Sequence, residues 1–452
     1  MNFLGRLLLL GGVGSAMLSA ALAEDMTPRT SIAITNAVVI DGTGRAALEG
    51  ATIVLAGDRI QAVGPANTIA IPRGAHVINA KGKTVMPGLA DLHVHLVGGW
   101  DGVSVDMLGY RRYLNALLYA GVTTVLDTGN VQPYVTQLRQ ETAAGRLPGP
   151  RIYAVGGIVD GADPVWPPIS YAASGDSQIP GIVRRLKNDN VDMIKAYVGL
   201  SHSQLRALAA EGRKQSLRVL VDQWTLNGSI DIVNDGIFGF AHMPTMTLGE
   251  RSFELFKEKN TVFVTTLAVL EYTARRRLKN LDFLRDPLIA DTTPPFFLDA
   301  LRVEATRKLS DEEQASMPRR EGRLPAAMRN AKALYDNGIL IAAGTDAPYP
   351  GVFQGESTHR EMELLVEAGL TPVQAIAVAT GNAAKLIGSD DWGVIAPGRR
   401  ADLVIVNGRP DRNIGDTRRI HMVIQGGRII DRARLKLDPK TDPGFHPAGP
   451  VG

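Results

Sequence analysis

Strand-like and helical segments alternate between about Gly88 and Gly388, and this alternation restricts the fold more than any other feature of the chain. Eight short apolar segments have the composition of buried strands: residues 91–97, 122–128, 151–157, 193–198, 218–224, 238–243, 261–267 and 340–346. Strands that alternate with helices pair in parallel, and eight such units in one sheet close most naturally into a barrel. We therefore predict an α/β fold with a (β/α)8 TIM-like barrel, whose active site lies at the C-terminal strand ends.

Three capping boxes mark the starts of predicted helices, because each places a Glu or Gln three residues after a Ser or Thr. They are Ser201 with Gln204, Thr358 with Glu361, and Thr371 with Gln374. The second and third predict two helices after the eighth strand, the third with Pro372 at its first helical position.

Both ends of the chain carry alternating apolar runs broken by turn residues, which is typical of a small β-sheet. The pattern extends from Ser31 to about Lys83 and returns near the C-terminus in ADLVIVNGRP and IHMVIQGGRII. We predict that the two ends pair into one small β-sandwich domain, with the barrel inserted between them. The predicted boundaries are 24–86 and 389–435 for the sandwich, 87–388 for the barrel and 436–452 for a tail.

Two segments are too long for ordinary connections within a barrel. Residues 158–178 follow the third strand, are rich in Pro, Gly and Ser, and contain Trp166. Residues 268–325 separate the seventh strand from the eighth. Both segments would emerge on the catalytic face, so we interpret them as walls or a lid of the pocket. A helical insertion outside the barrel is the alternative for the second segment.

The first residues have the pattern of a secretory signal: Arg6, a Leu-rich apolar stretch, and Ala21-Leu22-Ala23 before Glu24. The apolar stretch is short and glycine-rich for a membrane span. We predict removal of residues 1–23 and a periplasmic or secreted protein that is not membrane-bound after cleavage.

The composition of the chain restricts its possible binding partners and metal ligands. The formal net charge of +3 over 452 residues is small, so we expect a small-molecule substrate and no nucleic acid. The chain has no cysteine, which excludes disulfides and thiolate ligands. Any metal must therefore be held by His, Asp, Glu or a group derived from Lys. The sequence leaves a homo-oligomer open.

Polar side chains at the ends of predicted strands indicate a metal site. His93 and His95 are two positions apart in the first strand, so their side chains point the same way. Lys195 lies in the fourth strand, His242 ends the sixth, and Asp346 ends the eighth. In a barrel, residues at the C-terminal ends of distant strands converge.

These residues, with Val85-Met86-Pro87-Gly88 ahead of them and Gly344-Thr345-Asp346-Ala347 downstream, make the chain resemble the amidohydrolase superfamily of metal-dependent hydrolases, in its imidazolonepropionase/prolidase-like branch. The resemblance extends from about Ile32 to Arg432. It implies that Lys195 is a carboxylated lysine, whose anionic carbamate bridges two divalent ions. Zinc is the expected metal.

One position departs from the resembled pattern. The family has a histidine about twenty residues before the histidine of strand six, where this chain has Asp222. An aspartate can ligate zinc through oxygen, but it is shorter than histidine and negatively charged. We expect Asp222 to be a ligand or near-ligand. The sequence leaves open two ions, a single ion, or altered chemistry.

Two residues are expected to act in catalysis. A divalent ion activates water and polarises the scissile carbonyl. Asp346 is placed to accept a proton from the attacking water and pass it to the leaving nitrogen. Tyr197 shares one side of the fourth strand with Lys195 and could steady a carbonyl oxygen or oxyanion, although packing explains it equally well. His202 and His359 are interpreted as polar rim residues.

The predicted function is that of an exported metal-dependent amidohydrolase that cleaves an amide, peptide-like or cyclic amide C–N bond. One alternative is an ester or lactone hydrolase, or a single-metal deaminase, with the same site. Another is a catalytically impaired barrel that acts as a binding protein, with Asp222 as its sign. Trp100, Trp166 and Trp224 flank strand ends and favour an apolar or aromatic group in the substrate.

Overall fold

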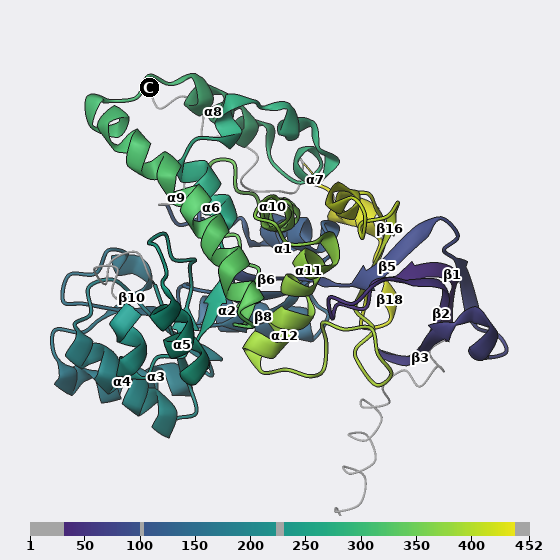
Figure 1. Ribbon diagram of the computed structural model, residues 1–452, viewed down its shortest axis with the longest axis horizontal. Coiled ribbons are helices and arrows are strands. Elements are labelled where there is room, and N and C mark those ends of the chain that lie inside the picture. The colour runs from purple at the N-terminus through teal and green to yellow at the C-terminus, as the bar shows by residue number, and fades with distance from the viewer. Residues whose placement is uncertain (1–30, 100–103, 223–229, 439–452) are drawn as a thin grey trace, which may run out of the picture.

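The computed structural model describes residues 31–99, 104–222 and 230–438 (Figure 1). The predicted signal segment, residues 1–23, lies outside the described residues, as does most of the predicted tail. Within the described ranges, no helix combines the length and the apolar composition that a bilayer crossing requires.

Eight parallel strands occur at the positions that the sequence predicts. They are β6 (Leu89–Val94), β7 (Val122–Asp127), β8 (Arg151–Ala154), β11 (Met193–Ala196), β12 (Arg218–Val221), β13 (Gly239–Phe240), β14 (Val262–Val264) and β15 (Ile341–Ala342). The third predicted strand is interrupted after β8 and continues as β9 (Ile158–Asp160), which pairs with β11. Every residue of β6 and β7 is buried, as expected for parallel strands covered on both faces.

Hydrogen bonds close these strands into a ring. The N–H of Leu92 in β6 donates to the carbonyl of Ala343 just after β15, at 2.8 Å. The N–H of Asp192 ahead of β11 donates to the carbonyl of Ala154 at the end of β8, also at 2.8 Å. The protein therefore has an α/β fold with parallel sheets, consistent with the predicted TIM-like barrel.

Helices connect the strands of the barrel. Those outside the long insertion are α1 (Tyr110–Tyr119), α2 (Tyr134–Ala143), α3 (Ile179–Asn188), α4 (His202–Lys214), α5 (Glu250–Glu258), α10 (Glu356–Glu367), α11 (Pro372–Val378) and α12 (Gly381–Ile387). Two predicted helix starts are confirmed, since Ser201 and Thr371 cap α4 and α11 with complete capping boxes. The third is wrong. Helix α10 begins at Glu356, and the hydroxyl of Thr358 instead donates to Asp91 at 2.9 Å.

The two ends of the chain pair with each other, as predicted. One eight-stranded sheet contains β1 (Ile32–Val39), β2 (Leu48–Ala56), β3 (Arg59–Pro65), β4 (His76–Asn79), β5 (Lys83–Pro87), β16 (Leu403–Asn407), β17 (Ile420–Gln425) and β18 (Arg428–Ile429). Antiparallel pairing of β5 with β16 joins the N-terminal and C-terminal parts, which lie side by side at the right of Figure 1. Because hydrogen bonds link all eight strands into one sheet, a sandwich of two separate sheets is not confirmed. The predicted domain boundaries stay a prediction.

The long insertion between strands seven and eight is helical. It contains α6 (Leu267–Thr273), α7 (Pro287–Ala290), α8 (Pro295–Thr306) and the first half of α9 (Asp311–Asp336). It has a small apolar cluster of its own, made by Leu278, Leu284, Ile289, Leu298 and Leu301. Helix α8 and one end of α9 stand at the top of Figure 1, away from the terminal sheet.

A buried ion cluster joins the insertion, the barrel and the C-terminal segment. Glu356 is fully buried at the start of α10. It accepts hydrogen bonds from Arg277 of the insertion at 3.0 Å and from Arg418 near β17 at 2.7 Å. Burial alone would raise the pKa of Glu356, but the two guanidinium groups hold this pKa well below its usual range.

The substitution Glu356→Gln is expected to lower the free energy of unfolding by about 3–5 kcal/mol at pH 7, because it leaves two partly buried guanidinium groups without their shared carboxylate. Urea unfolding measures this loss, with exposed Glu254→Gln as the control. Since the folded pKa is depressed, the stabilisation is complete above about pH 4.5 and declines as pH falls. Equal stability of wild type and variant at pH 7 would contradict the role of the cluster.

Candidate metal centre

All six predicted metal ligands line one cavity of about 300 Å³ at the C-terminal ends of the barrel strands. They are His93 and His95 at the end of β6, Lys195 in β11, Asp222 after β12, His242 after β13 and Asp346 after β15. The predicted convergence is therefore observed, while the role of each residue as a ligand stays a prediction. Within the cavity the six residues form two adjacent groups.

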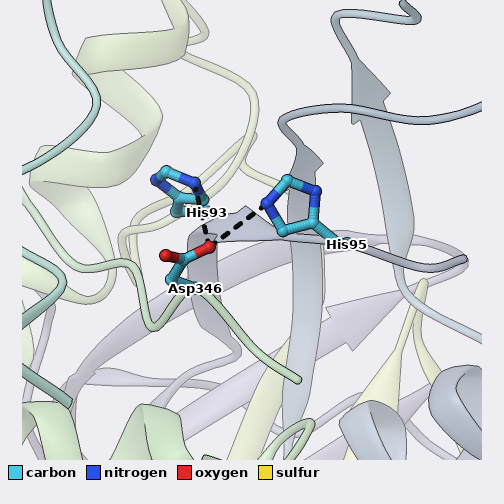
Figure 2. Close-up of side chains that lie close together, drawn as sticks. All are labelled: His93, His95 and Asp346. Atoms are coloured by element: carbon cyan, nitrogen blue, oxygen red, sulfur yellow. Dashed lines mark ion pairs between the residues drawn. The ribbon is translucent and has the colours of Figure 1, made fainter. Parts of the chain in front are cut away.

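The first group connects the first strand of the barrel, β6, with the segment after the last strand, β15. Asp346 Oδ1 lies 3.3 Å from His93 Nε2 and 3.2 Å from His95 Nε2 (Figure 2). One ligating atom of each residue lies within 4.8 Å of the other two. In the described part of the chain, this is the cluster of His and carboxylate groups that has the geometry to hold one metal ion.

The orientation of both histidines favours metal binding. His93 Nδ1 lies 2.8 Å from the carbonyl oxygen of Ala241, and His95 Nδ1 lies 3.0 Å from that of Gly129. A carbonyl can only accept, so each Nδ1 donates its hydrogen and each neutral ring presents the lone pair of Nε2 to the cavity. Two imidazole nitrogens and one carboxylate oxygen are a suitable donor set for a divalent ion such as zinc.

The pKa values of His93 and His95 are shifted in opposite directions. Burial lowers the pKa of His93 well below its usual value, and the charge of Lys195 lowers it further. Burial also opposes protonation of His95, but the hydrogen bond and the charge of Asp346 outweigh it and raise the pKa of His95. His93 is thus held neutral, as ligation requires.

The backbone of Asp346 adopts a left-handed conformation, with φ of 65°. Its N–H donates to the carbonyl of His93 at 2.7 Å, which ties the loop after β15 to the end of β6. A non-glycine residue in this region is strained, and such strain persists where the surrounding structure imposes it. Here the conformation places the carboxylate between the two histidines.

The second group consists of Lys195, Asp222 and His242. Asp222 Oδ2 lies 3.4 Å from Lys195 Nζ and 3.2 Å from His242 Nε2. Lys195 is 1% exposed and Asp222 is 2% exposed. The rings of His93 and His242 have centroids 4.5 Å apart, so the two groups adjoin.

Two buried carboxylates that sequence reasoning missed support the first group. Asp91 accepts hydrogen bonds from the N–H and the hydroxyl of Thr345, at 3.0 and 2.7 Å. Asp127 accepts one from the N–H of Leu96 at 2.9 Å, beside His95. Burial raises the pKa of each carboxyl to about 6. The strand period could have revealed Asp91, because Asp91, His93 and His95 occupy alternate positions.

Glu361 supports the second group from outside the cavity. It accepts hydrogen bonds from the N–H groups of Leu267 and Ala268 at the start of α6, at 2.8 Å each. Thr266, the residue before α6, has its hydroxyl 2.8 Å from His242 Nδ1. Glu361 thus holds the turn that carries the hydroxyl partner of His242. Burial raises the pKa of Glu361 to about 8.

Both long segments reach the cavity, as predicted. The segment after strand three contributes Ile158, Trp166, Pro168 and Ile169, and the helical insertion contributes Val269 and Thr273. Further apolar surface comes from Val97, Val105, Pro348 and Tyr349. Trp100 and Trp224 lie outside the described residues. The described wall is therefore largely apolar around a polar base.

Tyr197 and Trp166 are joined by a hydrogen bond in this wall. The indole N–H of Trp166 donates to the hydroxyl oxygen of Tyr197 at 2.8 Å. The Tyr197 hydroxyl therefore has its own hydrogen available for an acceptor in the cavity. Burial raises the pKa of Tyr197, and the charge of Asp222 raises it further, so the hydroxyl stays protonated.

The two remaining candidate histidines do not line the cavity in the described structure. His359 is fully buried in α10 and pairs with the hydroxyl of Thr417 and the carbonyl of Ala120, so the prediction of a rim position is wrong. The reason is that α10 begins earlier than predicted and carries His359 into its packed face. His202 lies at the start of α4, with Nδ1 2.6 Å from Asp235.

Arg323 of α9 is a further residue that the sequence did not single out. Burial and the neighbouring Arg319 and Arg320 lower the pKa of Arg323 to about 10, while the charge of Asp222 opposes this change.

Comparison with known proteins identifies the class of protein. Residues 84–430 match the model of the amidohydrolase family. The chain belongs to this family, as its motifs predicted, and is therefore an enzyme of that hydrolase class.

Particular relatives agree with this assignment. An imidazolonepropionase of Geobacillus thermodenitrificans is 26% identical over 385 residues, which covers 79% of this chain and 83% of the relative. A dihydroorotase of Streptomyces coelicolor is 25% identical, over 73% of this chain and 76% of the relative. The crystal structure of a Xaa-Pro dipeptidase with bound methionine has the same fold, with a TM-score of 0.72, 22% identity and coverage of 89% of this chain and all of the other.

The substitution Glu361→Gln is expected to change how stability depends on pH. The folded protein keeps the Glu361 proton up to about pH 8, whereas the unfolded chain releases it near pH 4.5. The wild-type free energy of unfolding should therefore fall across this interval, by on the order of 1 kcal/mol per pH unit. Glutamine resembles the protonated acid and removes this decline. Urea unfolding at several pH values tests the difference, and parallel curves for the two proteins would refute it.

Proposed function

We propose that this protein is a metal-dependent hydrolase that cleaves a carbon–nitrogen bond of an amide, peptide-like or cyclic amide substrate. The observation that carries the proposal is the convergence of His93 Nε2, His95 Nε2 and Asp346 Oδ1 at the base of the cavity. Membership of the amidohydrolase family supports it, as do relatives named imidazolonepropionase, dihydroorotase and Xaa-Pro dipeptidase.

The residues around the cavity have separate tasks in this reaction. A bound divalent ion, for which we propose zinc, supplies Lewis acidity that polarises the scissile carbonyl and activates water. Asp346 accepts a proton at a carboxylate oxygen and delivers it to the leaving nitrogen, because its carboxylate lies between the two histidines and faces the cavity. Tyr197 donates its hydroxyl hydrogen to the carbonyl oxygen, where negative charge develops.

The shape of the cavity indicates the kind of substrate. A volume of about 300 Å³ accepts a small molecule. Trp166, Ile169 and Tyr349 present apolar surface beside the polar base. We propose a substrate with an apolar or aromatic group next to the hydrolysed bond.

Export is part of the proposal. It rests on the signal pattern of residues 1–23, with Ala21-Leu22-Ala23 before Glu24. The mass of the mature protein from the native host tests it. A protein that begins at Glu24 supports export to the periplasm or beyond, and an intact N-terminus contradicts it.

Metal dependence gives the first test of the activity. Zinc- or manganese-loaded protein is expected to hydrolyse members of a panel of N-acyl amino acids, dipeptides, cyclic amides and aryl esters, and a chelator should abolish this activity reversibly. His95→Ala is expected to lose both bound metal and activity, because one of three donors is removed. His202→Ala is the matched control and should keep both, since His202 lies outside the cavity. A metal-loaded protein that only binds these compounds would favour the binding-protein alternative.

Tyr197→Phe is expected to lower kcat more than it raises KM, because the lost hydrogen bond acts where charge develops in the transition state. Trp166→Phe should lower kcat by a smaller factor, about 3–10-fold, since it removes only the hydrogen bond that orients the Tyr197 hydroxyl. Steady-state kinetics of the two single variants and the double variant measures the coupling. Additive effects would show that Trp166 does not act through Tyr197.

A further inference from the structure

The position at which this chain departs from the resembled pattern is occupied by a buried ion pair. Asp222 Oδ2 lies 3.4 Å from Lys195 Nζ, and both side chains are almost completely buried. The same carboxylate oxygen lies 3.2 Å from His242 Nε2. Strands β11 and β12 allow this proximity: Lys195 is in register with Leu220, so Asp222 lies two residues further along the neighbouring strand, on the same cavity-facing side and within reach of the long lysine side chain.

A buried lysine side chain requires a compensating negative charge. A neutral histidine at position 222 could not supply that charge, so a lysine beside it would be stabilised by conversion to an anionic carbamate that binds two cations. Asp222 supplies the charge directly. Asp222 therefore compensates the charge of Lys195 without a modification of the lysine and without a second metal ion.

A carbamate at Lys195 would be unfavourable beside Asp222. The Lys195 ammonium would first lose one proton, and carboxylation would then join Nζ of the neutral amine to the carbon of CO2 and release a second proton, so that a cation is replaced by an anion. Two like charges would then lie side by side at almost completely buried positions. The Lys195–Asp222 salt bridge would also be lost.

The ammonium group of Lys195, 3.4 Å from Asp222, also disfavours a second divalent ion at this point, because like charges repel. By contrast, His93, His95 and Asp346 place three donors within 4.8 Å of one another without help from Lys195 or His242.

We propose that Asp222 keeps Lys195 as an unmodified, positively charged amine, and that the protein takes one divalent ion, on His93, His95 and Asp346, instead of a lysine-bridged pair. This inference rests on the proposed function as a metal-dependent hydrolase. It replaces the carboxylated lysine and the second ion that the sequence resemblance implied.

Metal content and carbon-13 NMR of the wild-type protein test the proposal together. The purified full-length mature protein is equilibrated with excess zinc and ¹³C-bicarbonate, freed of unbound metal, and analysed by mass spectrometry for metal and by NMR for a carbamate signal. The expected result is one equivalent of zinc and no carbamate. A second equivalent, or a carbamate signal at any metal content, would overturn the inference and leave the proposed function standing. Absence of bound metal would instead refute the proposed function, and the inference with it.

The variant Asp222→His tests whether Asp222 is what prevents carboxylation of Lys195 and binding of a second ion. It removes the negative charge beside Lys195 and adds a nitrogen donor, so zinc content should rise towards two equivalents and a carbamate signal should appear. Asp402→Asn is the control, because Asp402 is also a buried aspartate with an ion-pair partner, Arg151, but lies by the terminal sheet. The control should keep one equivalent and give no signal. A folded Asp222→His protein that behaves like the control would contradict the role assigned to Asp222.

Discussion

The contact between β6 and the loop after β15 determines the site. These segments are separated by about 250 residues, yet Asp346 donates its N–H to the carbonyl of His93 and Thr345 binds the carboxylate of Asp91. The contact closes the ring of strands and places the Asp346 carboxylate between two imidazoles. Asp91 is completely desolvated, and the hydrogen bonds that it accepts offset this cost. Without this closure the three donor atoms would not lie together.

Each histidine of the cavity is oriented by a residue that follows another strand, which is a neighbouring strand for His95 and His242 and a strand across the barrel for His93. The partners of Nδ1 are the carbonyl of Gly129 after β7 for His95, the carbonyl of Ala241 after β13 for His93, and the hydroxyl of Thr266 after β14 for His242. The ring of strands therefore controls the position of each imidazole and, for His93 and His95, whose partners are carbonyl groups, the tautomer that faces the cavity. This arrangement keeps the site organised before any ligand binds, which reduces the free-energy cost of binding.

The charged side chains of the cavity are distributed between the first group and the second group. Asp346 lies with His93 and His95, while Asp222 lies with Lys195. Each group thus contains one carboxylate, but only the second contains a lysine that can neutralise it. This asymmetry distinguishes the chain from the pattern that it resembles, and it arises from a single position, just after β12. A change of one residue type at a strand end can therefore alter the chemistry of a barrel without altering its fold.

The sequence by itself determined the strands, the two capped helices and the six converging residues, because periodicity, capping and spacing are local properties. It could not identify Asp91, Asp127 and Glu361 as supports, since their hydrogen-bond partners come from distant segments. It misplaced His359 because the partners that hold this side chain in the packed face of α10, Thr417 and the carbonyl of Ala120, come from distant segments. Only the tertiary structure decided that the terminal strands form one sheet and that Asp222 faces Lys195, because both depend on which segments meet in space.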